Sequence, residues 1–201
     1  MDGPRETTIR GMTSALQRIA RAVSALERLP VQDQALSPAQ AETLRFAALT
    51  RPDMATVGQL ARVLGVRHPT AVGIVQPLID RGLVHRAPHP FDRRSHCLGL
   101  TGAGREAFAS LDSRERALRD SLAVLSPDEL HSAEAGLASV VCGLESAGLI
   151  VVSAPCAGCV HFRPGDGTSG EKPHRCDLIH RDLGDAESEM LCPEHAPASS
   201  R

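Results

Sequence analysis

Four of the six cysteines lie in the last 46 residues and place the strongest constraint on how this chain can fold. Their spacing is C-x2-C-x16-C-x15-C, formed by Cys156, Cys159, Cys176 and Cys192. The stretches between them are polar and contain Gly, Pro and His, so they offer too little apolar surface to bury a core. Such a segment needs a cross-link or a metal to hold one conformation, and four thiolates can bind one. We therefore predict that residues 151–201 form a metal- or iron–sulfur-binding extension with these four cysteines as ligands.

The spacing leaves the identity of the centre open. Four thiolates suit tetrahedral zinc, but zinc ribbons usually carry two close pairs, and here the third and fourth cysteines are isolated. Isolated thiolates around one C-x-x-C, with Pro193 directly after the last cysteine, fit an iron–sulfur cluster at least as well. We favour the cluster over zinc by a small margin, and a thiol switch or no site are the remaining alternatives. One of the nearby His161, His174 and His195 could replace a cysteine as ligand, but such a histidine more often lies outside the ligand set, so we leave them out of it.

The composition is that of a chain with a helical globular core. Hydrophobic residues make up 42% of the 201 residues, yet the chain has no Trp, no Tyr and four Phe. Leu, Val, Ile and Ala must therefore fill the core, which favours helices. No apolar run is long enough to span a bilayer, and the N-terminus lacks the apolar region of a signal peptide. We expect a cytoplasmic protein with no membrane partner, in which Cys97 and Cys142 are buried apolar side chains.

Apolar spacing and capping patterns predict a series of helices around one small hairpin. Residues 9–29 carry apolar side chains three and four apart, which is typical of an amphipathic helix. The expected starts of the later helices are Ser37, Thr56, His68, Thr101 and Ser126. The two short helices joined at Gly65 indicate a helix-turn-helix, and strands 83–86 and 97–101 around a charged tip indicate a β-wing. The predicted fold class is mainly α with a small β-wing: a winged helix-turn-helix domain in residues 1–150.

The charge distribution singles out the same part of the chain. The formal net charge is −2, yet residues 56–101 carry six arginines against two aspartates. A positive block inside an acidic chain is typical of a polyanion-binding element, and a merely solvated basic face is the alternative. The sequence has no Gly-rich phosphate loop, nucleophile elbow or HExxH motif, so we expect no enzyme activity.

The stretch from Arg86 to Thr101, with Asp92-x-Arg94 shortly before Leu100-Thr101, resembles the wing signature of the MarR family of bacterial regulators. The order of the predicted helices around the wing is also similar, over roughly residues 9–147. The resemblance implies a homodimeric winged-helix protein that binds double-stranded DNA, with its first and last helices forming the dimer interface. Proteins of this family are usually repressors that are relieved by small phenolic ligands or by oxidation.

The resemblance also assigns roles to single residues. Arg94 is expected to enter the minor groove of DNA, with Arg93 beside it at the wing tip and Asp92 holding both arginines by an ion pair. The alternative is an ordinary exposed ion pair on a hairpin. The remaining predicted DNA-binding residues are Arg86 on the wing and, on the second helix of the helix-turn-helix, Arg67, His68, Thr70 and Gln76. Pro77 is expected to bend that helix.

Together these features predict a homodimeric transcriptional regulator, most simply a repressor, whose DNA binding is coupled to a cysteine centre that senses redox or metal status. The centre is expected to pack near the dimer helices, because it directly follows the last of them, and to change the distance between the two recognition helices. One alternative keeps the fold but makes zinc purely structural and a small organic molecule the effector. Another alternative is a redox or electron-transfer protein that does not bind DNA.

Overall fold

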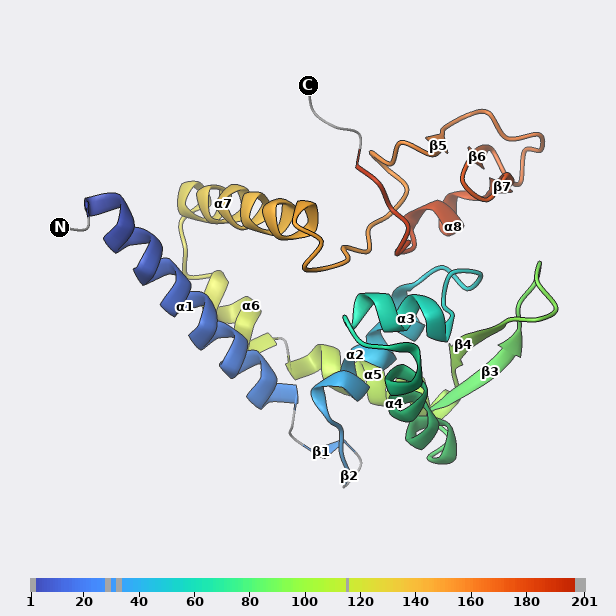
Figure 1. Ribbon diagram of the computed structural model, residues 1–201, viewed down its shortest axis with the longest axis horizontal. Helices are drawn as coiled ribbons and strands as arrows, with labels where there is room; N and C mark the ends of the chain where they lie inside the picture. The colour runs from blue at the N-terminus through green and yellow to red at the C-terminus, as the bar shows by residue number, and fades with distance from the viewer. Residues whose placement is uncertain (1–2, 28–29, 32–33, 115, 198–201) are drawn as a thin grey trace.

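A computed structural model describes residues 3–27, 30–31, 34–114 and 116–197. Figure 1 shows a winged-helix body, two long helices that project from it, and a small β-containing extension. The body and projecting helices comprise α1 (Pro4–Glu27), β1 (Pro30–Val31), β2 (Gln34–Ala35), α2 (Pro38–Leu49), α3 (Val57–Val63), α4 (His68–Asp80), β3 (Val84–Pro88), β4 (His96–Leu100), α5 (Gly102–Arg114), α6 (Arg116–Leu122) and α7 (Pro127–Ser146). The extension comprises β5 (Phe162–Arg163), β6 (His174–Cys176), β7 (Arg181–Leu183) and α8 (Asp185–Glu189). The predicted mainly helical fold with a small antiparallel wing is confirmed.

The helix starts lie where the capping patterns placed them. Ser37 and Ser126 each form a full capping box, in which the serine hydroxyl accepts the backbone N–H of the third helical residue and that residue's side chain accepts the serine N–H. Thr56 caps α3 through the N–H of Gln59. Thr101 caps α5 through the N–H of Gly104, at 3.0 Å.

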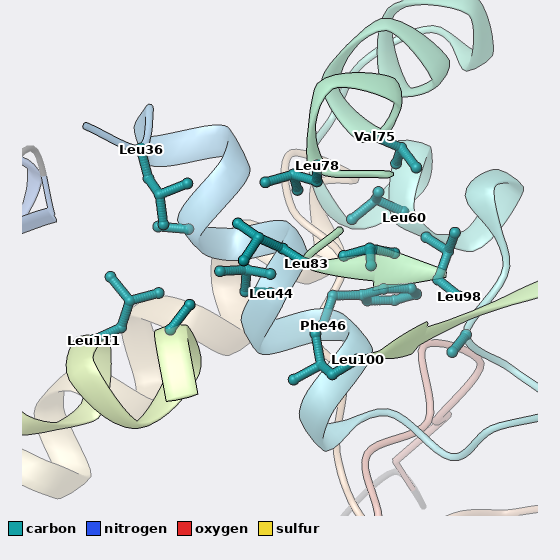
Figure 2. Close-up of a cluster of buried hydrophobic side chains, with 14 residues drawn as sticks. Leu36, Leu44, Phe46, Leu60, Val75, Leu78, Leu83, Leu98, Leu100 and Leu111 are labelled. Atoms are coloured by element: carbon teal, nitrogen blue, oxygen red, sulfur yellow. The ribbon is translucent and has the colours of Figure 1, made fainter. Parts of the chain in front are cut away.

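The core of the body is built around α2, whose inward side chains contact α4, α5 and the wing. Figure 2 shows Leu44 and Phe46 of α2 surrounded by leucines and a valine from these neighbours. The buried residues of this cluster are Leu36, Ala41, Leu44, Phe46, Ala55, Leu60, Val75, Leu78, Leu83, Val84, Leu98, Leu100, Ala107 and Leu111. As expected from the composition, aliphatic side chains supply almost all of this core.

The wing is a two-stranded antiparallel hairpin that is also tied to the loop before α3. Its register runs from Val84 opposite Leu100 to Pro88 opposite His96. The N–H of Leu98 donates to the carbonyl of Ala55 at 2.7 Å, which anchors β4 to the body. The base of the wing is therefore fixed to the body, while Asp92, Arg93 and Arg94 at its tip are exposed.

The extension contains a small core of its own. β5, β6 and β7 form an antiparallel sheet in chain order, and Cys156, Cys176 and Leu183 are buried against it. Phe162 and Ile179 pack onto this cluster. The strands are two or three residues long, so their period-2 pattern is too short to be detected in the sequence.

The helices α1, α6 and α7 leave much of their apolar surface uncovered in the single chain. In α7, all of which the structure describes, not one of the 20 residues is buried. Exposed apolar side chains on the three helices include Ile9, Met12, Ile19, Leu118, Leu122, Leu130, Leu137, Val140, Val141 and Leu144. Among the residues that the structure describes, no helix is long and apolar enough to cross a membrane.

Some expected elements differ in extent. The first helix begins at Pro4 rather than at residue 9, and the expected position Leu29 lies outside the described residues. One helix was expected after Thr101, and the structure describes two, α5 and α6, on either side of residue 115. The hairpin of β1 and β2 was not predicted, because its two-residue strands carry no recognisable pattern.

Candidate DNA-binding surface and cysteine cluster

The N-terminal end of α4 presents a polar, exposed set of side chains. The turn between α3 and α4 uses Gly65 in the left-handed region, at φ 63°, a conformation that glycine adopts without strain. Arg67 is the N-cap residue of α4 and its side chain makes no capping hydrogen bond. Arg67, His68 and Thr70 are all exposed, while Ala71, Val75 and Leu78 bury the opposite face of the helix against the core.

A depression of about 400 Å³ lies between the start of α3, the start of α4 and the wing. It brings together three residues of the predicted DNA-binding set, His68 of α4, Arg86 of β3 and Arg94 of the wing tip. Its other lining residues are Thr56, Val57, Gly58, Val72, Ser95 and His96. Two guanidinium groups and the amino end of a helix thus face one concave surface, an arrangement that favours a polyanion.

The rest of the predicted set lies outside this depression. Arg93 is exposed at the wing tip. Gln76 is exposed on α4, where its amide nitrogen donates to the carboxylate of Asp80 at 2.8 Å. The helix continues through Pro77 to Asp80. The assignment of these residues to DNA contacts stays a prediction.

Asp92 holds the wing tip in a different way from the one predicted. Its Oδ1 accepts the backbone N–H of Arg94 at 3.0 Å, and its backbone carbonyl accepts the N–H of Ser95. Within the described part of the chain, Asp92 forms no ion pair with either wing arginine. The short aspartate side chain reaches its own backbone two residues on, as in an Asx turn, and leaves the arginine side chains directed to solvent.

The four cysteines of the extension lie close enough to influence one another electrostatically. Cys156, Cys176 and Cys192 are buried and Cys159 is half-buried. The pKa of Cys156 is raised to about 11, chiefly by burial; Arg51 opposes the shift, and negative charge on the other three sulfurs adds to it. Burial also raises the pKa of Cys192, against an opposing hydrogen bond from the backbone of Glu194 and the charge of Arg51.

These cysteines fit a metal in chemistry but not in arrangement. Three buried thiols and one half-buried thiol form a suitable donor set for zinc or an iron–sulfur cluster. Two of them lie in a Cys-x-x-Cys turn that is closed by a hydrogen bond from the Cys159 N–H to the Cys156 carbonyl. Among the described residues, however, no three His, Cys, Asp or Glu side chains are placed to hold one metal ion. The metal centre and its identity therefore stay predictions.

The other two cysteines differ from each other. Cys97 is buried in β4, as expected, and its burial raises its pKa. Cys142 is exposed in α7, contrary to the expectation of a buried side chain, because the face of α7 that carries it has no partner within the chain described here.

The extension docks on the winged helix and not on the first and last helices of the body. Leu191 pairs with the end of α2: the N–H of Arg51 donates to its carbonyl at 2.9 Å, and its own N–H donates to the carbonyl of Leu49 at 3.0 Å. Glu194 accepts hydrogen bonds from Gln59 and Arg62 of α3. The expected packing near the first and last helices is therefore wrong, because the 15 residues between α7 and β5 let the extension reach the end of α2 and the loop before α3.

Sequence reasoning missed the residues at this docking interface. Arg51 and Asp53 form an ion pair at 2.6 Å with side chains exposed by 1% and 8%. Arg181 of the extension joins the same carboxylate at 2.8 Å. The segment Arg51-Pro52-Asp53 resembles an ordinary polar loop after a helix, and its burial depends on residues more than 100 positions later.

A helix-turn-helix followed by a two-stranded wing defines the winged-helix class of fold, and the chain belongs to that class. Residues 36–95 match the sequence model of the MarR family. The solved structure of Streptococcus pneumoniae FabT in complex with DNA is similar, with a TM-score of 0.60 at 20% identity, over 69% of this chain and 99% of FabT. The Staphylococcus aureus MepR–DNA complex is similar with a TM-score of 0.54 at 20% identity, over 66% of this chain and 97% of MepR. At these identities the likeness shows the fold.

Similar sequences match a part of the chain. An uncharacterised HTH-type transcriptional regulator of Mycobacterium tuberculosis is 43% identical over 54 residues, which are 27% of this chain and 34% of that protein. An uncharacterised HTH-type transcriptional regulator of Mycobacterium bovis is 36% identical over 75 residues, which are 37% of this chain and 52% of that protein. The chain thus spans between a third and about half of the length of these curated relatives.

Proposed function

We propose that this protein is a homodimeric DNA-binding transcriptional regulator, acting as a repressor. The observation that carries the proposal is the concave surface on which His68, Arg86 and Arg94 meet, at the start of α4 and beside the wing. The match of residues 36–95 to the MarR family and the likeness to two DNA-bound structures support it. The exposed N-terminal end of α4 would enter the major groove and Arg94 the adjacent minor groove.

The uncovered helices support the homodimer. The apolar side chains on α1, α6 and α7 form a large apolar surface in the single chain, and a monomer rarely leaves such a surface exposed. Two copies joined through it would present two α4 helices to the same duplex. A two-fold symmetric site of this kind places half-sites about one helical turn apart.

The test is binding to a duplex that the wild-type protein selects from a random-sequence library, followed by fluorescence anisotropy over a salt series. We expect specific binding that weakens steeply with salt, because arginine–phosphate contacts release counterions. Replacing Arg94 with Ala should weaken affinity by about tenfold or more. The matched control is Arg163→Gln, an exposed arginine of the extension that pairs with Asp177 and lies outside the proposed surface. Failure to select any duplex would refute the proposal.

A second proposal concerns the cysteines: the extension binds zinc or an iron–sulfur cluster through Cys156, Cys159, Cys176 and Cys192, and its state is coupled to DNA binding. Its support is the burial and mutual electrostatic influence of the four sulfurs. The test is iron, sulfide and zinc analysis of protein purified without oxygen, together with its absorbance spectrum. Absorbance between roughly 320 and 450 nm with iron and sulfide indicates a cluster, and one zinc per chain indicates a structural site. Protein that contains neither refutes it.

An organic effector remains the alternative regulator. A cavity of about 410 Å³ lies between α2, β4 and α5, with mostly apolar walls and Arg105 among its lining residues. Met190, just after α8 of the extension, forms part of its lining. Release of DNA on titration with a phenolic acid would favour this alternative, and unchanged DNA binding up to millimolar concentration would exclude it for that class of ligand.

A further inference from the structure

The extension contacts the wing of the DNA-binding body through a small group of charged residues. Asp53, in the loop between α2 and α3, accepts Arg51 Nε on Oδ1 at 2.6 Å and Arg181 Nη1 on Oδ2 at 2.8 Å. We call these three residues, Arg51, Asp53 and Arg181, the Asp53 junction. Arg181 belongs to β7 of the extension, where it also pairs with Glu187 at 3.5 Å, so the junction joins two parts of the chain.

The junction reaches the wing by two routes. The guanidinium of Arg181 lies over the ring of Phe91 at the wing tip, 3.6 Å from the ring centroid. The backbone carbonyl of Asp53 lies 2.8 Å from Nε2 of His89. Because Nδ1 of His89 accepts the N–H groups of Phe91 and Asp92, the ring carries its hydrogen on Nε2 and donates it to Asp53. Two wing residues are thus held by the Asp53 junction.

On its other side the junction reaches the cysteine cluster. Nη1 of Arg51 lies 3.8 Å from Sγ of Cys156, and the Arg51 side chain is 1% exposed. One buried arginine therefore contacts both the thiol cluster and the carboxylate that holds the wing. Ion pairs between exposed side chains contribute little to stability. Here the side chains of Asp53 and Arg181 are only 8% and 18% exposed, so solvent screens the attraction between their charges less.

We propose that the extension positions the wing: Arg181, docked on Asp53 and stacked on Phe91, fixes the orientation of the hairpin that carries Arg93 and Arg94. Arg181 is a positioning residue, since its own guanidinium is occupied by Asp53, Glu187 and Phe91. The consequence for DNA affinity rests on the proposed function, while the effect on the wing itself does not. The winged helix and the extension then act as one unit, in which a change at the cysteine cluster has a direct path to the wing.

The experiment compares hydrogen exchange of the wing amides, residues 89–95, in full-length wild type and in Arg181→Gln. We expect exchange in this segment to rise by about threefold to tenfold, while the amides of α2 keep their wild-type rates. Arg163→Gln, which removes an exposed arginine of the extension from its pair with Asp177, is the matched control and should leave the wing unchanged. Wing exchange equal to wild type, or a rise that extends equally through α2, overturns the proposal.

A second variant approaches the same contact from the wing. Phe91 is 61% exposed, so Phe91→Leu removes the aromatic ring without disturbing the core. It should raise wing exchange as Arg181→Gln does, and the double variant should add little to Arg181→Gln, because both remove the same contact between Arg181 and Phe91. Fully additive effects contradict the proposed contact. If the wild type selects a DNA duplex, Arg181→Gln should also bind it more weakly. If it selects none, the proposed function fails and wing exchange still decides this inference.

Discussion

Gly104 lies in the first turn of α5, against the backbone of Leu83, the residue directly before strand β3 of the wing. A Cβ atom built on Gly104 would collide with the backbone carbonyl of Leu83. Thr101 brings the two segments together, because its hydroxyl donates to the carbonyl of Gly82 at 2.6 Å and accepts the N–H of Gly104. The requirement for glycine here is therefore a matter of space, since Leu83 is buried and its backbone cannot move aside.

We predict that Gly104→Ala lowers the free energy of unfolding by about 1–3 kcal/mol, through a forced shift of packed backbone. Gly102 is the matched control, because a Cβ there meets nothing within 4 Å in the same helix. Urea denaturation of both variants measures the difference. Equal stability of the two variants would show that the backbone of Leu83 gives way.

Asp92 offers a second test at the scale of one residue. Since its carboxylate accepts the N–H of Arg94, Asp92→Ala should raise the exchange rate of that amide by about threefold to tenfold. Asp92→Asn keeps an acceptor oxygen in the same position and should stay close to wild type. If charge rather than the acceptor atom held the tip, both variants would exchange alike.

Single residues also show which contacts can be predicted from the sequence and which cannot. The positions of Arg94, Arg86 and His68 on one surface follow from motif spacing within 30 residues, and the structure brings them together. The role of Arg51 could not be predicted, because its carboxylate partner is local but its burial comes from Cys156 and Leu191 far along the chain. Asp92 was predicted to be important for the tip, yet its partner is a backbone amide, which sequence alone does not distinguish from a side chain.

The helix starts that carry a side-chain cap, at Ser37, Thr56, Thr101 and Ser126, were predicted correctly because capping is a local interaction. Ser37, for example, accepts the N–H of Gln40 at 3.3 Å, and the Gln40 side chain accepts the N–H of Ser37 at 3.0 Å. At α3, Thr56 and Gln59 have the residue types of a capping box, but only half of the box is formed. Gln59 supplies its N–H to Thr56, but its side chain donates to Glu194 of the extension at 2.8 Å. A tertiary contact has replaced the local one.

At the scale of the element, we predict that Ser37→Ala lowers the free energy of unfolding by about 1 kcal/mol, because the backbone N–H of Gln40 loses the Ser37 hydroxyl that accepts it at the N-terminus of α2. Ser132→Ala, at an exposed position inside α7, serves as the control and should be neutral or slightly stabilising. Thermal or urea unfolding, monitored by circular dichroism, measures the stability of the two variants. A Ser37→Ala variant as stable as the control would mean that solvent replaces the cap without loss.

At the scale of the whole molecule, the described chain leaves its apolar side chains unequally covered. The body around α2 has a closed core, whereas Leu137 of α7 is 46% exposed and Val140 and Val141 are each 40% exposed. Burying apolar area is worth about 25 cal/mol per Å², so a surface of this kind favours association. The sequence predicted the helices and their amphipathic pattern. The surface that covers these apolar side chains is determined by the assembly, because it does not lie within the described part of one chain.

We predict that Leu137→Glu converts the protein from a dimer to a monomer, because it places a charge in the apolar face that two copies would share. Light scattering coupled to size-exclusion chromatography at about 10 μM measures this, as a change from twice 21.3 kDa to 21.3 kDa. Ser132→Glu, on the opposite side of α7, is the control and should remain dimeric. Because both half-sites of a duplex must be bound together, Leu137→Glu should also lose most of the specific DNA affinity while retaining a folded winged helix. A wild type that is monomeric at this concentration contradicts the dimer, whereas a dimer that survives Leu137→Glu places the interface elsewhere.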